Sequence, residues 1–307
     1  MLFLLSLPLK LRQMNIHDYM RAGTAPFALL DLRRSAVFLA LLLFSLGFFH
    51  CDISFAEQLN ELRVCLLADN LPLSSRKDES GFDVDTAKAV AEALKRTFVP
   101  VWTENSTRVI EVEESDFPLR RLARGECDAI FSMPGEDAIK GAPKAALGKP
   151  YYGAAFELIG RGQIPNSLET VGNAPVAVQA QTIANFVLSA QKVKMRTFFS
   201  ISAALEGVAK GEAPIAFLWG PMAGWYLRSH PELDLTLAAG YKPQPVVSWN
   251  EHVATRKSDT SLREAIDAAL EKLHAGGTIK TLMEKYGMPF HPPFASTYSI
   301  SEIQKLK

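Results

Sequence analysis

Short apolar runs alternate with amphipathic segments along residues 62–290, and this alternation constrains the fold more than any other feature of the chain. The apolar runs that predict buried strands are 62–67, 98–102, 127–131, 174–180 and 214–219. Apolar residues at helical spacing predict helices over 83–94, 117–124, 182–190, 202–210, 222–229, 261–275 and 279–286. Strands and helices that alternate in this way predict an α/β fold with mostly parallel sheets.

Composition narrows the class of protein. The 307 residues are 48% hydrophobic and 21% charged, values typical of an ordered globular protein. The formal net charge of +0 argues against a nucleic-acid partner, because such proteins usually carry a basic excess. Three cysteines are too few for a disulfide scaffold, and their spacing fits no metal site.

The N-terminal region predicts export. Arg33 and Arg34 precede the apolar run 36–49, and the small-x-small triplet 54–56 follows it. A membrane-spanning helix needs about 20 apolar residues, so this run is more typical of a cleaved signal peptide. We therefore expect residues 1–56 to be a signal peptide with an N-terminal extension, and the mature protein to lie in the periplasm.

Two helix starts carry capping residues. Asp83 precedes the first helical segment and is expected to cap it, since acidic side chains are favourable at the positive end of a helix. Ser261 and Glu264 have the spacing of a capping box.

Three motifs resemble those of the periplasmic solute-binding proteins of family 3. They are G-F-D-V-D at 81–85, G-E-C-D-A-I at 125–130 and P-Y-Y at 150–152. The resemblance extends over about residues 61–290, which is nearly all of the expected mature chain. Each motif alone is weakly specific, but their order and the signal peptide strengthen the match.

A narrower resemblance points to one branch of that family. Residues 62–65, 70–74, 125–128 and above all W-G-P-x-A-G at 219–224 are similar to the quinoprotein-dehydrogenase-associated branch, typified by the methanol-oxidation J proteins. Members of this branch occur alongside PQQ-dependent alcohol dehydrogenases. The resemblance implies an association with such a dehydrogenase system.

The family resemblance implies a type II periplasmic-binding-protein fold with two α/β lobes and two hinge strands. Carried onto this chain, lobe one is 57–158 plus 245–295, lobe two is 159–244, and 296–307 is a C-terminal tail. The hinge passages are expected at 157–161 and 244–249. Closure on a ligand would be a hinge motion.

Ligands of open α/β sheets lie where strand ends and helix starts converge. On this basis we expect a small-molecule ligand in the cleft between the lobes. Its expected contacts are Asp69, Leu71, Ser74, Met133 and Tyr151 from lobe one, and Gln179, Gln181, Thr182 and Trp219 from lobe two.

Two charged contacts with an amino acid are missing from the expected positions. The arginine that would bind an α-carboxylate falls near Gly141, where only Lys140 is close. Trp219 stands where an aspartate would bind the ammonium. A buried, unpaired zwitterion is costly, so the ligand is expected not to be an amino acid. The alternative is that Lys140 replaces the arginine as a point charge.

The resemblance places Cys65 and Cys127 at the starts of neighbouring strands of lobe one. Because disulfides persist outside the cytoplasm, we expect these two residues to be bonded. Two buried free thiols are the alternative.

Three functions remain open. The first is a solute-binding protein that delivers its ligand to an ABC permease and meets the membrane only through that permease. The second is an accessory protein that binds the PQQ-dependent dehydrogenase itself, and the third is an ordinary amino-acid ABC binding protein. The chain has no recognisable catalytic motif or cofactor fingerprint, so no enzyme activity and no cofactor are expected. Asp69 is the one clear general-acid candidate if the protein were an enzyme.

Overall fold

The computed structural model describes residues 60–104, 117–303 and 305. The chain divides after Ala56, and residues 57–307 form one compact unit. The expected signal peptide and the acidic stretch 105–116 lie outside the described residues.

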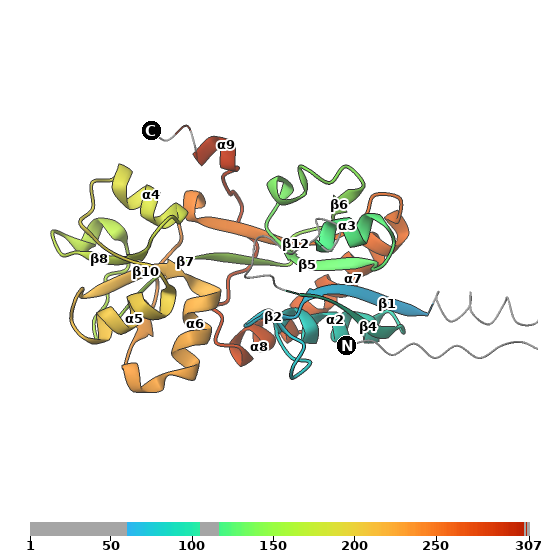
Figure 1. Ribbon diagram of the computed structural model, residues 1–307, viewed down its shortest axis with the longest axis horizontal. Coiled ribbons are helices and arrows are strands. Elements are labelled where there is room, and N and C mark those ends of the chain that lie inside the picture. The colour runs from blue at the N-terminus through green and yellow to red at the C-terminus, as the bar shows by residue number, and fades with distance from the viewer. Residues whose placement is uncertain (1–59, 105–116, 304, 306–307) are drawn as a thin grey trace, which may run out of the picture. The chain divides into compact units, whose positions relative to one another are not determined.

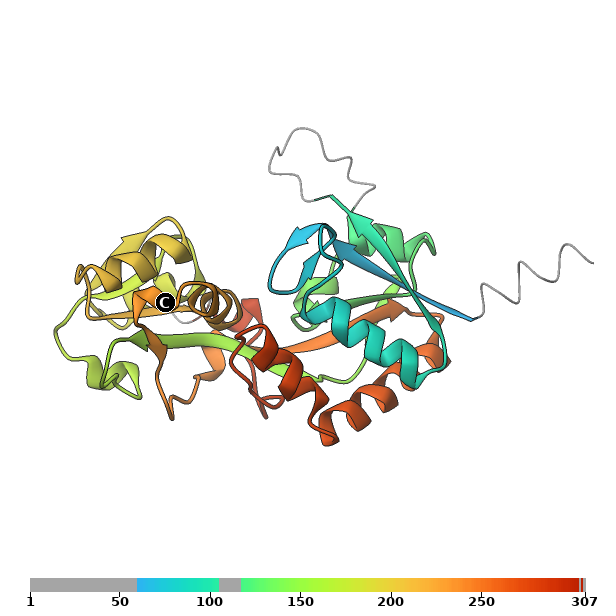
Figure 2. The same ribbon diagram turned by 90° about the horizontal axis from the view of Figure 1, so that it is seen from below.

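The sheet of lobe one has β1 at its centre (Figure 1). β1 pairs in parallel with β4 and with β5, and α2 packs against β1 and β4. The C-terminal helices α7 and α8 pack against α2, and Figure 2 shows the three together. The elements are β1 (Glu61–Leu67), β2 (Asp69–Asn70), β3 (Ser74–Ser75), α2 (Phe82–Ala93), β4 (Thr97–Thr103), α3 (Pro118–Ala123), β5 (Ala129–Met133), η2 (Glu136–Ile139), β6 (Ala145–Leu147), α7 (Thr260–Ala275) and α8 (Thr278–Lys285).

Lobe two is built on three parallel strands, β10, β8 and β9. Helix α4 packs on β8 and β9, α5 on β8 and β10, and α6 on β10. The elements are η3 (Leu168–Val171), β8 (Val176–Gln179), α4 (Ile183–Ala190), β9 (Met195–Phe198), α5 (Ile201–Ala209), β10 (Ile215–Trp219), α6 (Gly220–Ser229), η4 (Pro231–Leu233), β11 (Thr236–Leu237) and η5 (Pro245–Val247).

Two long strands join the lobes, β7 (Tyr152–Gly160) and β12 (Ser248–Arg256) (Figure 1). They pair with each other over 152–155 and 248–251. Beyond this stretch β7 pairs with β10, and β12 pairs with β5. Residues 156–160 therefore already belong to the sheet of lobe two, and the first passage lies earlier than the expected 157–161.

The strands form a mixed sheet, so the expectation of mostly parallel sheets is wrong. The strands β4, β1 and β5 of lobe one are parallel to one another, and so are β10, β8 and β9 of lobe two, as the alternation with helices predicts. The two joining strands run antiparallel to each other and to their partners β10 and β5. One carries the chain into lobe two and the other returns it, and this reversal of direction sets their orientation.

Both expected helix caps are wrong. Helix α2 begins after Gly81, and Asp83 lies inside its first turn, only 6% exposed. Helix α7 begins after Asp259 and has no side-chain cap hydrogen bond, so Ser261 and Glu264 form no capping box. The burial of Asp83 is important for the site described below.

The G-F-D-V-D motif fastens α2 to the end of the chain. Gly81 has φ 128°, and a Cβ there would lie 2.3 Å from the carbonyl oxygen of Leu73. Its amide donates to the Tyr286 hydroxyl at 2.8 Å, and that hydroxyl donates to Asp85 at 2.7 Å. The motif therefore has a structural role at the end of α8.

The G-E-C-D segment is structural as well. Asp128 accepts hydrogen bonds from Arg63 at 2.8 Å and from Arg256 at 3.0 Å. Burial opposes ionisation of Asp128, but these hydrogen bonds outweigh it and hold its pKa below the usual value. Next to it, Cys127 is bonded to Cys65 with the two Cα atoms 5.6 Å apart, which confirms the expected disulfide.

The W-G-P-x-A-G motif brings α6 against the segment that follows α8. A Cβ on Gly220 would lie 2.8 Å from Pro289, and one on Gly224 would lie 2.0 Å from the carbonyl oxygen of Gly287. Only glycine permits this approach. The motif thus brings lobe two into contact with the last part of lobe one.

The C-terminal segment makes a third passage between the lobes. Met288 is buried in the core of lobe one, and His291 hydrogen-bonds to Glu157 at 2.6 Å. The Asn250 side chain bonds the backbone of Phe294 at 2.9 and 2.7 Å. The expected tail contains α9 (Ile300–Ile303), whose Ile303 is buried in the core of lobe two.

In the part of the chain that the structure describes, no helix has both the length and the apolar character needed to cross a membrane.

Candidate ligand-binding site

A cavity of about 540 Å³ lies where the two lobes and the two joining strands meet, and we name it the cleft cavity. Apolar and aromatic side chains form most of its wall. It is lined by Leu73, Ser132, Pro134, Asp137, Ala138, Tyr152, Phe156, Ile183, Trp219, Pro221, Trp249 and Glu251.

Ser132 is the centre of a hydrogen-bond network on the lobe-one side. Its hydroxyl donates to Asp83 Oδ1 at 2.5 Å and lies 2.8 Å from the Tyr152 hydroxyl. Its backbone amide donates to the Tyr151 hydroxyl at 3.2 Å. Ser132 has φ 51°, an uncommon conformation for a residue other than glycine. This network holds the end of β5 in place at the cleft.

Two buried carboxyl groups lie on this side of the cleft. Burial raises the pKa of Asp83 to about 7, although the hydrogen bond from Ser132 opposes the shift. Burial, followed by repulsion from Asp83, raises the pKa of Glu251 to about 8. Burial also raises the pKa values of Tyr151 and Tyr152, so these residues remain neutral hydroxyls.

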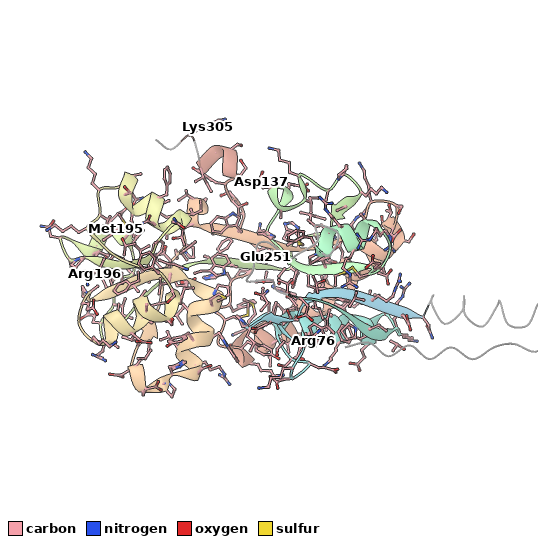
Figure 3. The ribbon with its side chains drawn as sticks, viewed as in Figure 1. Arg76, Asp137, Met195, Arg196, Glu251 and Lys305 are labelled. Atoms are coloured by element: carbon pink, nitrogen blue, oxygen red, sulfur yellow. A yellow bond between two sulfur atoms is a disulfide. The ribbon has the colours of Figure 1, made fainter. Side chains whose placement is uncertain are left out.

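Glu251 differs from Asp83 because its side chain has no hydrogen-bond partner at Oε2. It lies on β12, opposite Tyr152 of β7, and is 4% exposed. Figure 3 labels Glu251 where β12 passes between the lobes. A buried oxygen without a partner is costly, so a polar ligand group at this position would be favourable.

Three aromatic rings form another part of the cavity wall. The Trp219 ring lies 5.5 Å from Phe156 and 5.6 Å from Trp249, measured between ring centroids. Phe156 and Trp249 are 6.2 Å apart. Each ring meets the others edge to face, an arrangement that stabilises an aromatic cluster.

The nine residues that were expected to contact the ligand do not all line the cleft cavity. Trp219 lines the cleft cavity, as expected. Ser74 and Met133 line the neighbouring cavity of lobe one, and Tyr151 is buried behind Ser132. The remaining five are absent from the cleft-cavity lining: exposed Asp69 and Gln181, and half-buried Leu71, Gln179 and Thr182.

Some of these residues are nevertheless next to the lining. Thr182 caps α4 by accepting from the Asn185 amide, and the following residue, Ile183, lines the cavity. Leu73 lines it two residues after Leu71. Most of the expected residues that do not line the cleft cavity therefore lie one or two positions from residues that do.

The main residues that the sequence prediction misses are Tyr152, Phe156, Trp249 and Glu251. Trp249 and Glu251 are two apart on β12, so they share one face of the strand. That alternation of an aromatic and an acidic residue after the second hinge was the available signal. Tyr152 is the other tyrosine of the P-Y-Y motif.

A larger cavity of about 710 Å³ lies in lobe one. It shares Leu73, Ser132 and Ala138 with the cleft cavity. One of its lining residues, Phe117, directly follows the stretch 105–116, which lies outside the described residues. No site is assigned to it.

Among the described residues no lysine or arginine lines the cleft cavity. Lys140 is exposed and is not part of that lining. The described residues also contain no group of three or more side chains suited to bind a metal ion. The polar side chains of the described lining are hydroxylic and acidic, and the others are aliphatic or aromatic.

Comparisons with known proteins agree with this architecture. The model of the bacterial extracellular solute-binding proteins, family 3, matches residues 62–289. Protein MoxJ of Methylorubrum extorquens is 25% identical over an alignment of 262 residues that covers 75% of this chain and 82% of MoxJ.

Two solved structures show the same α/β fold. MxaJ from Methlophaga aminisulfidivorans has a TM-score of 0.53 and 22% identity, and the match covers 75% of this chain and 99% of MxaJ. The unliganded open L-cystine solute receptor of Neisseria gonorrhoeae has a TM-score of 0.62 and 16% identity, over 76% and 96% of the two chains.

Proposed function

Since the chain belongs to the bacterial extracellular solute-binding proteins of family 3, we propose that it is a periplasmic protein that binds a small ligand other than an amino acid. The ligand occupies the cleft cavity, and the lobes close on it by a hinge motion. Residues 1–56 serve as a cleaved signal peptide. Binding, and not catalysis, is the function.

The lining of the cleft cavity is the observation that carries this proposal. An α-carboxylate needs a charged donor, and no lysine or arginine is present among the described lining residues. Trp219 occupies the position at the end of β10 where an aspartate would bind an ammonium. The cavity therefore suits a ligand that has no carboxylate.

The likeness to MoxJ supports a role beside a PQQ-dependent alcohol dehydrogenase. In this role the protein delivers its ligand to an ABC permease that serves the same metabolism. The gene neighbourhood tests this assignment: permease and ATPase genes support delivery, and a dehydrogenase gene without them supports an accessory role.

That accessory role is the second candidate, because lobe two exposes large apolar side chains. Phe199 is 97% exposed, and Phe186 and Met222 are 39% and 42% exposed. Contiguous apolar patches are typical of protein-binding surfaces, and in this role Phe199 would be the main residue of such a patch. In this role the protein binds the dehydrogenase directly.

One pair of variants separates the two roles. Trp219→Ala removes a cavity wall and is expected to abolish small-molecule binding while leaving dehydrogenase binding intact. Phe199→Ser is expected to have the opposite effect if the accessory role is correct. Thermal-shift screening against a small-molecule collection and co-purification with the dehydrogenase are the measurements. If both variants retained both interactions, both roles would be contradicted.

A further inference from the structure

Glu251 is a buried acid that faces a ligand cavity without a partner. It is 4% exposed, it lines the cleft cavity, and its Oε2 atom accepts no hydrogen bond. No described lysine, arginine or histidine forms an ion pair with it. An ionised carboxylate in such a position is strongly unfavourable until a positive charge reaches it.

The groups around Glu251 reinforce this preference for positive charge. Asp83 of α2 raises the cost of ionising Glu251, and Asp137 of η2 also lines the cavity. Tyr152 of β7 and Tyr151, which precedes it, contribute neutral hydroxyls. Every charged side chain in the described lining is therefore acidic.

The aromatic part of the cavity wall suits the same kind of ligand. The Trp219 and Trp249 rings line the cleft cavity together with Phe156. Aromatic faces attract organic cations, and tryptophan does so most strongly. A small metal ion would gain little here, because the described residues supply no set of three ligating side chains.

We propose that the cleft cavity binds a small organic ammonium ion that carries no carboxylate, with Glu251 as its counter-ion and Trp219 and Trp249 as its aromatic wall. This inference rests on the proposed function, because it names the class of ligand for the same cavity. The cation replaces the missing partner of Glu251, and its alkyl groups contact the rings.

Binding is coupled to a proton. In the empty cavity the Glu251 carboxyl is largely protonated at neutral pH, because burial raises its pKa to about 8. An ammonium ion favours the carboxylate, so the carboxyl proton leaves to solvent as the cation enters. The positive charge of the ligand then balances the carboxylate of Glu251.

The test uses isothermal titration calorimetry of the purified protein with choline and with ethanolammonium. The matched control ligand is the neutral analogue of choline in which carbon replaces nitrogen. At least one cation is expected to bind, and the neutral analogue about ten- to a hundredfold more weakly. Titrations in buffers of different ionisation enthalpy should show proton release.

The variants identify the counter-ion. Glu251→Gln keeps the shape of the side chain and is expected to weaken cation binding about ten- to a hundredfold and to abolish proton release. Glu136→Gln makes the same chemical change at an exposed position outside the cavity lining, so binding should not change. Trp219→Leu should weaken binding of the cation more than binding of the neutral analogue. Trp219→Phe should restore part of the preference for the cation.

Two results would overturn the inference. One is no binding of either cation, and the other is cation binding that Glu251→Gln leaves unchanged. In both cases, screening a collection of neutral and anionic molecules for binding would test the proposed function separately. A neutral or anionic ligand whose binding Trp219→Ala abolishes would preserve that function and remove only the ammonium ligand.

Discussion

Gly224 of lobe two lies directly against the carbonyl oxygen of Gly287, so closely that a Cβ at position 224 would be 2.0 Å from that atom. The contact joins α6 to the turn after α8 through backbone alone. It gives the glycines of the W-G-P-x-A-G motif a physical role at the junction of the lobes.

Gly224→Ala should therefore destabilise the protein. The added methyl group has no room, so the helix must move away from Gly287, at a cost of about 1–3 kcal/mol. Urea unfolding measures the loss. Gly141→Ala is the control, because a Cβ there meets no atom within 4 Å. Equal stability of the two variants would show that the contact is not tight.

Stability should fall as the pH rises from about 5 to about 8. The pKa values of Asp83 and Glu251 are raised from 3.8 and 4.5 to about 7 and about 8. The folded state thus binds more protons than the unfolded chain in this window, and each group lowers the free energy of unfolding by up to about 1.4 kcal/mol per pH unit. The pKa of Asp128 is lowered below 3.8, so its contribution stays constant there.

Glu251→Gln should reduce this slope, because the variant side chain does not titrate. Urea unfolding at about pH 5 and about pH 8 measures it. Glu136→Gln, at an exposed position, should retain the full slope. A slope that is the same in both variants would mean that Glu251 is ionised in the folded protein throughout.

Removal of the disulfide should cost about 4 kcal/mol, because the bond closes a loop with a sequence separation of 62 residues. The double variant Cys65→Ser with Cys127→Ser avoids a free thiol. Reduction of the unmodified protein should lower the free energy of unfolding by a similar amount, which is measured as a lower urea midpoint. If reduction has no effect on that midpoint, the bond does not stabilise the folded state.

The standard amino acids should produce no saturable thermal shift. A ligand at 100 times its dissociation constant adds about 2.7 kcal/mol of stability, which is easily detected. The cleft cavity offers no basic group among its described lining residues to bind an α-carboxylate. A clear shift with any amino acid at sub-millimolar concentration would restore the amino-acid alternative with Lys140.

Much of the fold follows from local sequence pattern. The buried face of α2, with Val84, Ala87 and Val90, was predictable because helical spacing places these residues on one side. The disulfide was predictable because β1 and β5 are neighbours. Strand direction was harder to predict from the sequence, because the antiparallel pairing of β7 with β12 depends on where the chain leaves lobe one and where it returns to it.

The site was less predictable than the fold. The P-Y-Y motif indicates both tyrosines, and both hydroxyls lie close to Ser132. Only Tyr152, the first residue of β7, lines the cavity, and local pattern does not show which of two adjacent buried tyrosines the packing leaves at the cavity wall. Glu251 was missed because nothing local shows that its carboxyl is buried; its burial arises from the packing of both lobes around β12.

The segment after α8 has a mechanical consequence. Two adjacent antiparallel strands can both bend and twist, so a hinge made of β7 and β12 alone would leave lobe two free to rotate about the strand axis. Residues 288–303 cross the same boundary, held by the Asn250 side chain at Phe294 and by Ile303 in the core of lobe two. A third anchored passage resists torsion while still permitting bending. The lobes are thus expected to move with essentially one degree of freedom, opening and shutting about a single axis.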